Sequence, residues 1–275
     1  MKFSLLLFTL LLAQVRPHNL PTALSFGLDA TSYIMLQMNM EPVKEAISVC
    51  SWVLKRTPVG TTDAWFAYNA PSRIHEILIA GRISIWAYML KSNTANSQEV
   101  LPDTWHHVCL TWSYETKKTI LYFDGEAIAE RETGETKLTV GGTMAIGQYH
   151  RQANMEATFH SHPFGGQLLK MNIYTRQLKP QEVEDMFYGG LCSDNEDKLV
   201  EDTFLRWETI LYATERKGNV TEVPVTCSGD YWNVLYFPDF FNKVSFHAAV
   251  VGDFICIVIK ILILLYHSSL FGSIS

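Results

Sequence analysis

The chain has 275 residues, of which 48% are hydrophobic and 18% charged, so it can bury a sizeable core and is not a wholly disordered protein. Its 22 basic and 28 acidic residues give a net charge of −6 and form no basic stripe, which argues against a nucleic-acid partner. A chain of this length accommodates either one large β domain or two small domains.

The N-terminal residues have the pattern of a secretory signal peptide. Lys2 supplies the positive charge, and residues 5–12 supply an apolar core that is too short to span a bilayer comfortably. We predict a signal peptide within residues 1–23, with cleavage after Ala13 or at a later position up to Ala23. The alternative, an apolar N-terminal strand, is less favoured because the leucine-rich run directly follows Met-Lys.

Short runs of β-branched and aromatic residues alternate with turns through residues 24–228, which we take as one domain. Asp124-Gly125, directly after the alternating run 119–123, predicts a two-residue β-hairpin. Many short strands at regular spacing are typical of an all-β sandwich or jelly roll. The predicted strands cover residues 31–36, 47–54, 107–112, 119–123, 144–147 and 167–174.

One segment, residues 179–190, predicts a short helix. It has Pro180 near its start, acidic residues in its first turns and Gly189-Gly190 at its end, and each of these features favours a helix at that place. Val183, Met186 and Phe187 are spaced so that they share one face, which we expect to be buried.

The C-terminal segment, residues 229–275, differs in character from the rest. Residues 246–266 are almost wholly apolar and long enough for a membrane helix, but Asp253 and Lys260 interrupt them, at a cost of roughly 2.5–3.5 kcal/mol each near the centre of a span. Three interpretations stay open: a marginal membrane anchor, a helix that packs on another surface, and a truncated end. A GPI signal fits poorly because Lys260 lies inside the hydrophobic tail.

Export determines how the cysteines are interpreted, because thiols pair in oxidising compartments. The chain has five, namely Cys50, Cys109, Cys192, Cys227 and Cys256, with no CxxC or Cys/His spacing that indicates structural zinc. Asn219-Val220-Thr221 is the single N-glycosylation sequon, and it agrees with secretion and a surface loop.

The segment 107–113 carries a resemblance to a known family. His107, Cys109, Thr111 and Trp112 match the pentraxin signature His-x-Cys-x-Ser/Thr-Trp-x-Ser/Thr, although Tyr114 departs from its last position. Further segments follow in the family's order over about residues 24–212, including Trp207 near the domain's end. The resemblance implies an all-β, two-sheet antiparallel jelly-roll sandwich with one short helix on a face.

The resemblance also implies a disulfide between Cys50 and Cys109. It would close a loop of about 60 residues and stabilise the fold by about 4 kcal/mol in the chain-entropy model. A second bridge, between Cys192 and Cys227, is similar to that of the pentraxin-like domains in adhesion G-protein-coupled receptor ectodomains. Cys256 is then left over.

Pentraxins hold calcium on one face, and calcium needs six to eight oxygen ligands. When the family's calcium-binding positions are followed along this chain, the side-chain carboxylates are replaced, and Arg151 introduces a cation. We therefore expect no calcium binding in the family's manner. The vacated positions are Ile74, His75, Tyr149, His150, Arg151, Thr158 and Ser161.

Histidines occupy two of these positions, His75 and His150, and His160 and His162 lie close in sequence. Imidazole suits zinc, so a zinc site at His75 and His150 is one alternative, and a pH-sensitive surface is another. Surface histidines on a variable loop remain the simpler interpretation, because zinc needs three or four ligands in fixed geometry and no carboxylate or cysteine partner is evident.

These observations favour an extracellular binding or adhesion module, secreted or tethered at the cell surface, over an enzyme. Its expected partner is an extracellular protein or glycan, and no cofactor is expected. A soluble, oligomeric, secreted pentraxin of the pattern-recognition kind is the alternative. A carbohydrate-active enzyme would need paired carboxylates, and the glutamates of residues 126–135 surround a hairpin with no sugar platform evident.

Overall fold

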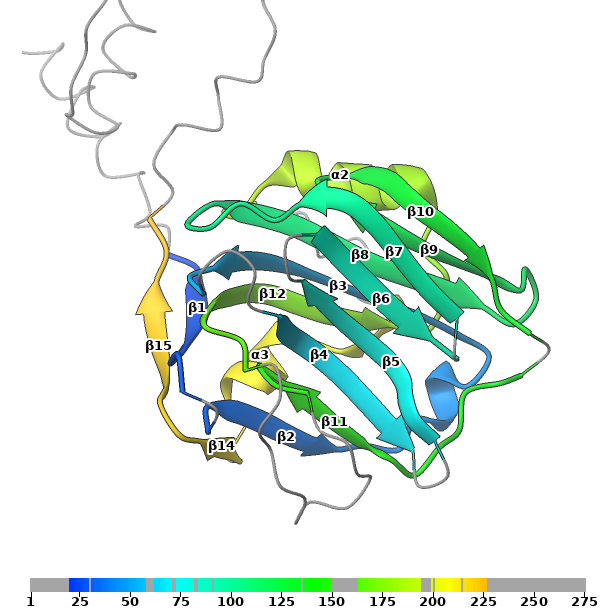
Figure 1. Cartoon of the computed structure of the whole chain (residues 1–275), viewed down its shortest axis with the longest axis horizontal. Helices are drawn as coiled ribbons and strands as arrows, with labels where there is room; N and C mark the ends of the chain where they lie inside the picture. The colour runs from blue at the N-terminus through cyan, green and yellow to red at the C-terminus, as the bar shows by residue number, and fades with distance from the viewer. Residues whose placement is uncertain are drawn as a thin grey trace, which may run out of the picture. The chain divides into compact units, whose positions relative to one another are not determined.

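The computed structural model describes residues 20–226, apart from 30, 58–61, 71–72, 82–83, 91, 135, 150–162, 194–198, 200 and 214. The chain divides into two compact units, Met1–Thr226 and Cys227–Ser275, and the second lies outside the described residues. The described part of the first unit consists of two antiparallel β-sheets and three short helices, one of which, α2, lies on the outer face of a sheet (Figure 1). The predicted all-β sandwich with one short helix on a face is therefore confirmed.

The first sheet, here sheet A, carries the signature segment. Its strand order is β10-β9-β8-β3-β12-β1-β15, and β13 pairs with β12 beside this path. All of these pairings are antiparallel. The strands are β1 (Thr22–Phe26), β3 (Ala46–Lys55), β8 (Trp105–Ser113), β9 (Lys118–Phe123), β10 (Glu126–Glu132), β12 (Gly166–Tyr174), β13 (Thr203–Leu205) and β15 (Val220–Pro224).

The second sheet, sheet B, carries Ile74 and His75, two of the positions at which the family resemblance implies calcium ligands. Its strand order is β14-β2-β11-β4-β5-β6-β7, again antiparallel throughout. The strands are β2 (Tyr33–Gln37), β4 (Asp63–Ala70), β5 (Arg73–Gly81), β6 (Ser84–Met89), β7 (Ser92–Glu99), β11 (Thr143–Ile146) and β14 (Arg216–Lys217). Three short helices, η1 (Glu41–Val43), α2 (Pro180–Gly189) and α3 (Trp207–Leu211), complete the described elements.

All six predicted strands and the predicted helix are present with small shifts at their ends. The Asp124-Gly125 hairpin is confirmed as well: β9 passes into β10 through these two residues, whose φ angles are 49° and 84°. Two consecutive positive φ values are what a type I′ turn requires, and Asp-Gly supplies them at low cost. The strands β4 to β7 were not predicted, although they form more than half of sheet B.

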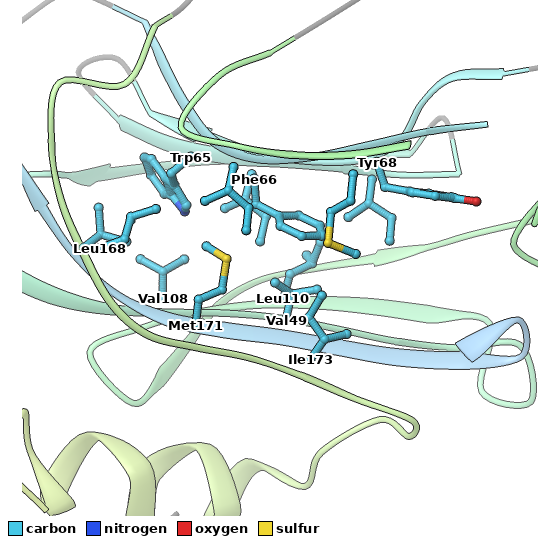
Figure 2. Close-up of a cluster of buried hydrophobic side chains, with 14 of the residues drawn as sticks. Val49, Trp65, Phe66, Tyr68, Val108, Leu110, Leu168, Met171 and Ile173 are labelled. Atoms are coloured by element: carbon cyan, nitrogen blue, oxygen red, sulfur yellow. The ribbon is translucent and has the colours of Figure 1, made fainter. Parts of the chain in front are cut away.

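The core lies between the two sheets. Figure 2 shows Trp65, Phe66 and Tyr68 of β4 facing side chains of β3, β8 and β12 across the interior. Trp65 and Phe66 are fully buried, and burying such side chains stabilises the fold by roughly 1.5–3 kcal/mol each. The residues that they face are Val49, Val108, Leu110, Leu168, Met171 and Ile173.

A buried ion pair ties the two sheets together beside this core. The Lys55 Nζ atom at the end of β3 lies 2.9 Å from an Asp63 carboxylate oxygen at the start of β4, and both side chains are buried. Thr57 donates its hydroxyl hydrogen to the same carboxylate oxygen. A buried charge is tolerated when it is paired and hydrogen-bonded, so these three residues have a structural role.

Candidate functional site

The signature residues lie on β8, in the interior of sheet A, and none of them is exposed. His107, Cys109, Thr111 and Trp112 are all buried. Trp112 points into the core and donates its indole N–H to the Thr133 hydroxyl at 2.9 Å. The signature therefore marks a structural strand rather than a surface that could hold a ligand.

His107 is packed against aromatic rings on the outer face of sheet A. Its ring centroid is 5.3 Å from that of Trp52, and Trp52 in turn stacks at 5.9 Å on Phe187 of α2. Burial lowers the pKa of His107 to about 4, because the charged imidazolium loses its hydration there, although the nearby Asp124 charge opposes the shift. His107 is consequently neutral at physiological pH.

Asp124 links the signature strand to the hairpin. Its carboxylate accepts the His107 backbone N–H and lies 2.8 Å from His106 Nδ1, while its own N–H donates to the His107 carbonyl oxygen at 2.8 Å. Sequence reasoning identified Asp124 only as a turn residue. Its side chain also satisfies polar groups at the start of β8, so Asp124 joins the turn to the signature strand.

The predicted Cys50–Cys109 disulfide is present and joins the adjacent strands β3 and β8. Helix α2 covers it, since Val183 of the helix belongs to the same buried cluster as the two cysteines, Tyr122 and Tyr174. The predicted buried stripe of the helix is confirmed, with Val183 fully buried and Met186 and Phe187 partly so. The outer face of sheet A is thus a second, smaller core under α2.

An arginine fixes the start of α2 to this face. Arg176 makes a bidentate ion pair with Glu182, at 2.7 and 2.8 Å, and a further contact of 2.7 Å with Asp202. The bidentate contact lowers the pKa of Glu182, and the same contact raises the pKa of Arg176. Glu182 also accepts the backbone N–H of Lys179 at 2.8 Å, so it caps the helix. Sequence reasoning did not single out Arg176.

The vacated calcium positions are only partly within the described residues. Ile74 and His75 lie at the beginning of β5, and Tyr149 lies shortly after β11. His150, Arg151, Thr158 and Ser161 lie outside the described residues, as do His160 and His162. The zinc interpretation at His75 and His150 therefore stays a prediction.

Gly147 positions the chain before Tyr149. Its φ of 85° favours glycine, and a Cβ atom there would lie 2.4 Å from the Phe26 ring. Its N–H donates to the Trp65 carbonyl oxygen at 3.1 Å, and its carbonyl oxygen accepts the Phe164 N–H at 2.9 Å. These bonds hold Gly147 against Trp65 of β4 and bring Phe164 next to it.

Tyr149 packs on the outer face of sheet B and is only 5% exposed. It forms a cluster with Ala64 and Ala67 of β4 and with Leu78 and Ala80 of β5, separate from the main core. An aromatic side chain on small apolar neighbours thus occupies a position where the family resemblance implies a carboxylate ligand. Such a surface excludes water and supplies none of the charged oxygens that calcium requires.

One buried carboxylate, Glu76, remains directly after the vacated pair on β5. It accepts hydrogen bonds from the Thr139 backbone N–H at 3.1 Å and from the Thr139 hydroxyl at 2.9 Å. The Tyr68 hydroxyl holds the same segment by donating to the Thr139 carbonyl oxygen at 2.7 Å and accepting the Gly142 N–H at 3.0 Å. Glu76 was missed in the sequence, and these contacts give it a role in anchoring residues 139–142.

Other predicted sites have mixed outcomes. Cys192 is disulfide-bonded, but Cys227 lies outside the described residues, so their pairing stays a prediction. Asn219 is exposed in the turn between β14 and β15. Among the described residues no three or more His, Cys, Asp or Glu side chains are grouped as metal ligands.

The acidic hairpin and the tail add no site to the described part of the molecule. Glu126, Glu130 and Glu132 are exposed along the edge strand β10, and Glu130 lies 2.7 Å from Lys118. No helix within the described ranges is long and apolar enough to cross a membrane. The apolar tail 246–266 lies outside those ranges, so its predicted role stays open.

Two antiparallel sheets packed face to face, with a short helix on the outer face of one of them, form a concanavalin A-like sandwich. The chain matches the model of the concanavalin A-like lectin/glucanases superfamily over residues 28–184, more than half of its length, and it belongs to this family. Within the family the domain is pentraxin-like, as its similarity to pentraxins shows.

Two curated relatives illustrate this similarity. Neuronal pentraxin-2 of Cavia porcellus is 27% identical over 154 residues, which cover 53% of this chain and 34% of the relative. Human pentraxin-4 is 24% identical over 179 residues, which cover 62% of this chain and 37% of the relative. The match thus spans a little over a third of the length of these relatives.

Solved structures agree on the fold. The heptameric SAP-like pentraxin of Limulus polyphemus aligns with a TM-score of 0.55 at 15% identity, covering 74% of this chain and 95% of that one. A Bacteroides ovatus protein assigned a carbohydrate-binding role aligns with a TM-score of 0.56 at 12% identity, covering 76% of this chain and 61% of that one. At such identities the similarity establishes the architecture alone.

Proposed function

We propose that this chain is an extracellular pentraxin-like binding module that recognises a protein or glycan without calcium. The observation that carries the proposal is Tyr149, which lies buried on Ala64, Ala67, Leu78 and Ala80 at a position where the resemblance implies a calcium ligand. Replacing a carboxylate by a buried phenol removes the charge that attracts the ion and fills the space beside the sheet.

Export is part of the proposal. The predicted signal peptide, the Cys50–Cys109 disulfide and the exposed sequon at Asn219 are mutually consistent with the secretory route. Cleavage after Ala13 would leave β1 intact, whereas cleavage after Ala23 would remove Thr22 and Ala23, which pair with Pro224 and Val223 of β15. We therefore place the mature N-terminus ahead of Thr22.

The binding role is favoured over an enzymatic one. The glutamates of β10 are exposed, Glu130 is paired with Lys118, and a β-bulge between Ala127 and Ala129 turns Glu126 to the opposite face of the strand from Glu130 and Glu132. A glycosidase of the usual kind needs two carboxyl groups that face each other across the substrate, at about 5–9.5 Å. The predicted Cys192–Cys227 bridge resembles one in adhesion-receptor ectodomains. Receptor tethering and adhesion would be properties of a longer protein that contains this module.

The test is binding in the presence and absence of calcium. The exported chain, labelled at an added tag, is applied to arrays of glycans and of extracellular proteins in calcium and then in chelator. We expect at least one ligand to be retained equally in both conditions. Signals that vanish in chelator, together with a calcium-induced rise of the melting temperature, would overturn the proposal, because an ion that binds only the folded state must stabilise it. A rise with zinc alone would instead support the histidine site.

A further inference from the structure

Within the part of the chain that the structure describes, the last strand of sheet A has an open side. Strand β15 pairs with β1 and, among the described residues, with no second strand. An edge strand offers a row of backbone N–H and C=O groups to any other chain that can pair with it. The opposite edge strand of the sheet, β10, differs because it lies close to β7 of sheet B.

The register shows which groups of β15 point outward. Gly27 donates its N–H to the Asn219 carbonyl oxygen, and Val225 donates to the Pro21 carbonyl oxygen, both at 2.9 Å. Hydrogen-bonded pairs alternate along an antiparallel ladder, so residues 219, 221, 223 and 225 point their backbone groups at β1. Residues 220, 222 and 224 therefore point theirs away from the sheet.

Two of these outward positions already carry features that discourage strand pairing. Pro224 has no N–H to donate, and proline in a sheet is characteristic of an edge. Glu222 places a charge on the same strand and pairs with Arg216 at 2.9 Å. The outward N–H groups of Val220 and Glu222 can still donate hydrogen bonds to a new strand.

The sequon lies at the beginning of this edge. The backbone of Asn219 is held by Gly27 and by the Ser32 hydroxyl, which accepts its N–H at 2.9 Å, whereas its side chain is exposed. Thr221, the third residue of the sequon, is exposed as well. The Asn219 amide is therefore accessible next to the outward N–H of Val220.

We propose that an N-linked glycan on Asn219 covers the open edge of sheet A and prevents copies of the domain from pairing through β15. A lipid-linked oligosaccharide pyrophosphate is the donor: its sugar C1–O bond breaks, a C1–N bond forms to Asn219 Nδ2, the amide loses one proton, and the lipid pyrophosphate leaves. A neighbouring strand would lie about 4.8 Å from β15, within the space that a bulky glycan occupies. The inference rests on the proposed export.

The experiment uses the full chain expressed in a secretory host, with glycan occupancy measured by mass spectrometry before and after enzymatic deglycosylation. Asn219→Gln and Thr221→Ala each remove the sequon, and Thr221→Ser is the matched control that keeps it. We expect the wild type and Thr221→Ser to be glycosylated and monodisperse by light scattering. We expect the two sequon-free variants to form larger species at the same concentration, with an unchanged far-ultraviolet spectrum.

A second substitution tests the mechanism. Glu222→Pro removes an outward N–H that β1 does not use, so the double variant Asn219→Gln/Glu222→Pro should return to the size of the wild type. Association that persists in the double variant overturns the role of the edge, as does a sequon-free variant that stays monodisperse. An exported chain without a glycan overturns this inference alone, whereas a chain retained unglycosylated inside the cell overturns the proposed export as well.

Discussion

The two outer faces of the sandwich have different chemistry. On sheet A, α2 covers the Cys50–Cys109 disulfide, and Arg176 fastens the helix through two carboxylates. On sheet B, Tyr149 covers small apolar residues at a place where the resemblance implies charged ligands. The first face keeps the disulfide and the helix that the resemblance implies, whereas the second has a buried tyrosine where the resemblance implies a carboxylate.

The difference follows from the geometry of a sheet. Successive residues of a strand alternate between faces, so outward positions can change while the inward ones keep the core. On β5, Ile77 and Ile79 belong to the main core, whereas Leu78 and Ala80 belong to the outer cluster under Tyr149. Ligand chemistry can therefore be lost from sheet B without altering the packing between the sheets. The outer face of sheet A has less freedom, because it forms a core of its own.

Removing the disulfide should give the largest effect. Replacing Cys50 and Cys109 together by Ala opens a link between residues 59 apart in sequence, and we expect the free energy of unfolding to fall by about 4 kcal/mol in the chain-entropy model. Denaturant unfolding of the exported wild type and the variant measures the difference. The free energies of unfolding of the two proteins should become similar when both are unfolded in reductant. A loss below about 1 kcal/mol would show that α2 and its cluster stabilise this face without the bridge.

The second-largest loss of stability should come from the outer face of sheet B. Tyr149→Ala uncovers four apolar neighbours, and we expect a loss of about 3 kcal/mol, typical of truncating a buried aromatic side chain. Tyr149→Phe is the matched control, and it should cost less than about 1.5 kcal/mol because the ring is kept. If Tyr149→Ala unfolds at the same denaturant concentration as the wild type, Tyr149 does not stabilise this face by packing.

The buried histidine gives sheet A a pH dependence. The pKa of His107 is about 4 in the folded chain and near 6.5 when unfolded, so between these values the unfolded state takes up a proton that the folded state does not. The stability from neutral His107 is complete above pH 6.5 and is lost as the pH falls toward 4. We expect a loss of about 2 kcal/mol between pH 6.5 and 5.

His107→Leu is the comparison for that measurement, because it has similar volume and does not titrate. Unfolding of both proteins by denaturant over this pH range isolates the contribution of His107 from that of other groups. The variant should show a smaller acid-induced loss than the wild type. Equal losses would mean that His107 is hydrated in the folded chain, which would contradict its burial beside Trp52.

Much of sheet A could be predicted from the sequence, since β3, β8, β9 and β12 carry runs of β-branched and aromatic residues, and the hairpin has its Asp-Gly turn. Sheet B was harder. Strand β7, Ser-Asn-Thr-Ala-Asn-Ser-Gln-Glu, has a polar composition that is typical of a loop, and only its pairing with β6 makes it a strand. Local propensity does not report such long-range pairing.

The candidate site, too, could be predicted only in part. The replacement of carboxylates at the predicted calcium positions could be read from the sequence because it concerns side-chain types, and the absence of calcium binding that it predicts stays a prediction. The partners of Glu76, Arg176 and Asp124 could not be read, because Thr139, Asp202 and His106 lie 18 to 63 residues away in the chain. Hydrogen bonds between distant residues leave no periodic signal. The buried packing of Tyr149 on alanines likewise depends on the fold that brings β4 and β5 together.

The smallest predicted effect concerns the ion pairs that fasten α2. Arg176→Met removes charge-assisted hydrogen bonds to Glu182 and Asp202, and because these side chains are 25–41% exposed we expect a loss of only about 1 kcal/mol at neutral pH. The Arg176 contact lowers the pKa of Glu182, so its contribution is present above the ordinary pKa of glutamate and is lost as the pH falls through the lowered value. The difference in the free energy of unfolding between wild type and variant, measured by denaturant at pH 7 and again near pH 3, should therefore become smaller in acid.

Lys118→Met, which breaks the more exposed pair with Glu130, is the matched control and should cause no measurable loss of stability. A gap that stays constant with pH would mean that Arg176 supports α2 through the packing of its aliphatic stem rather than through charge.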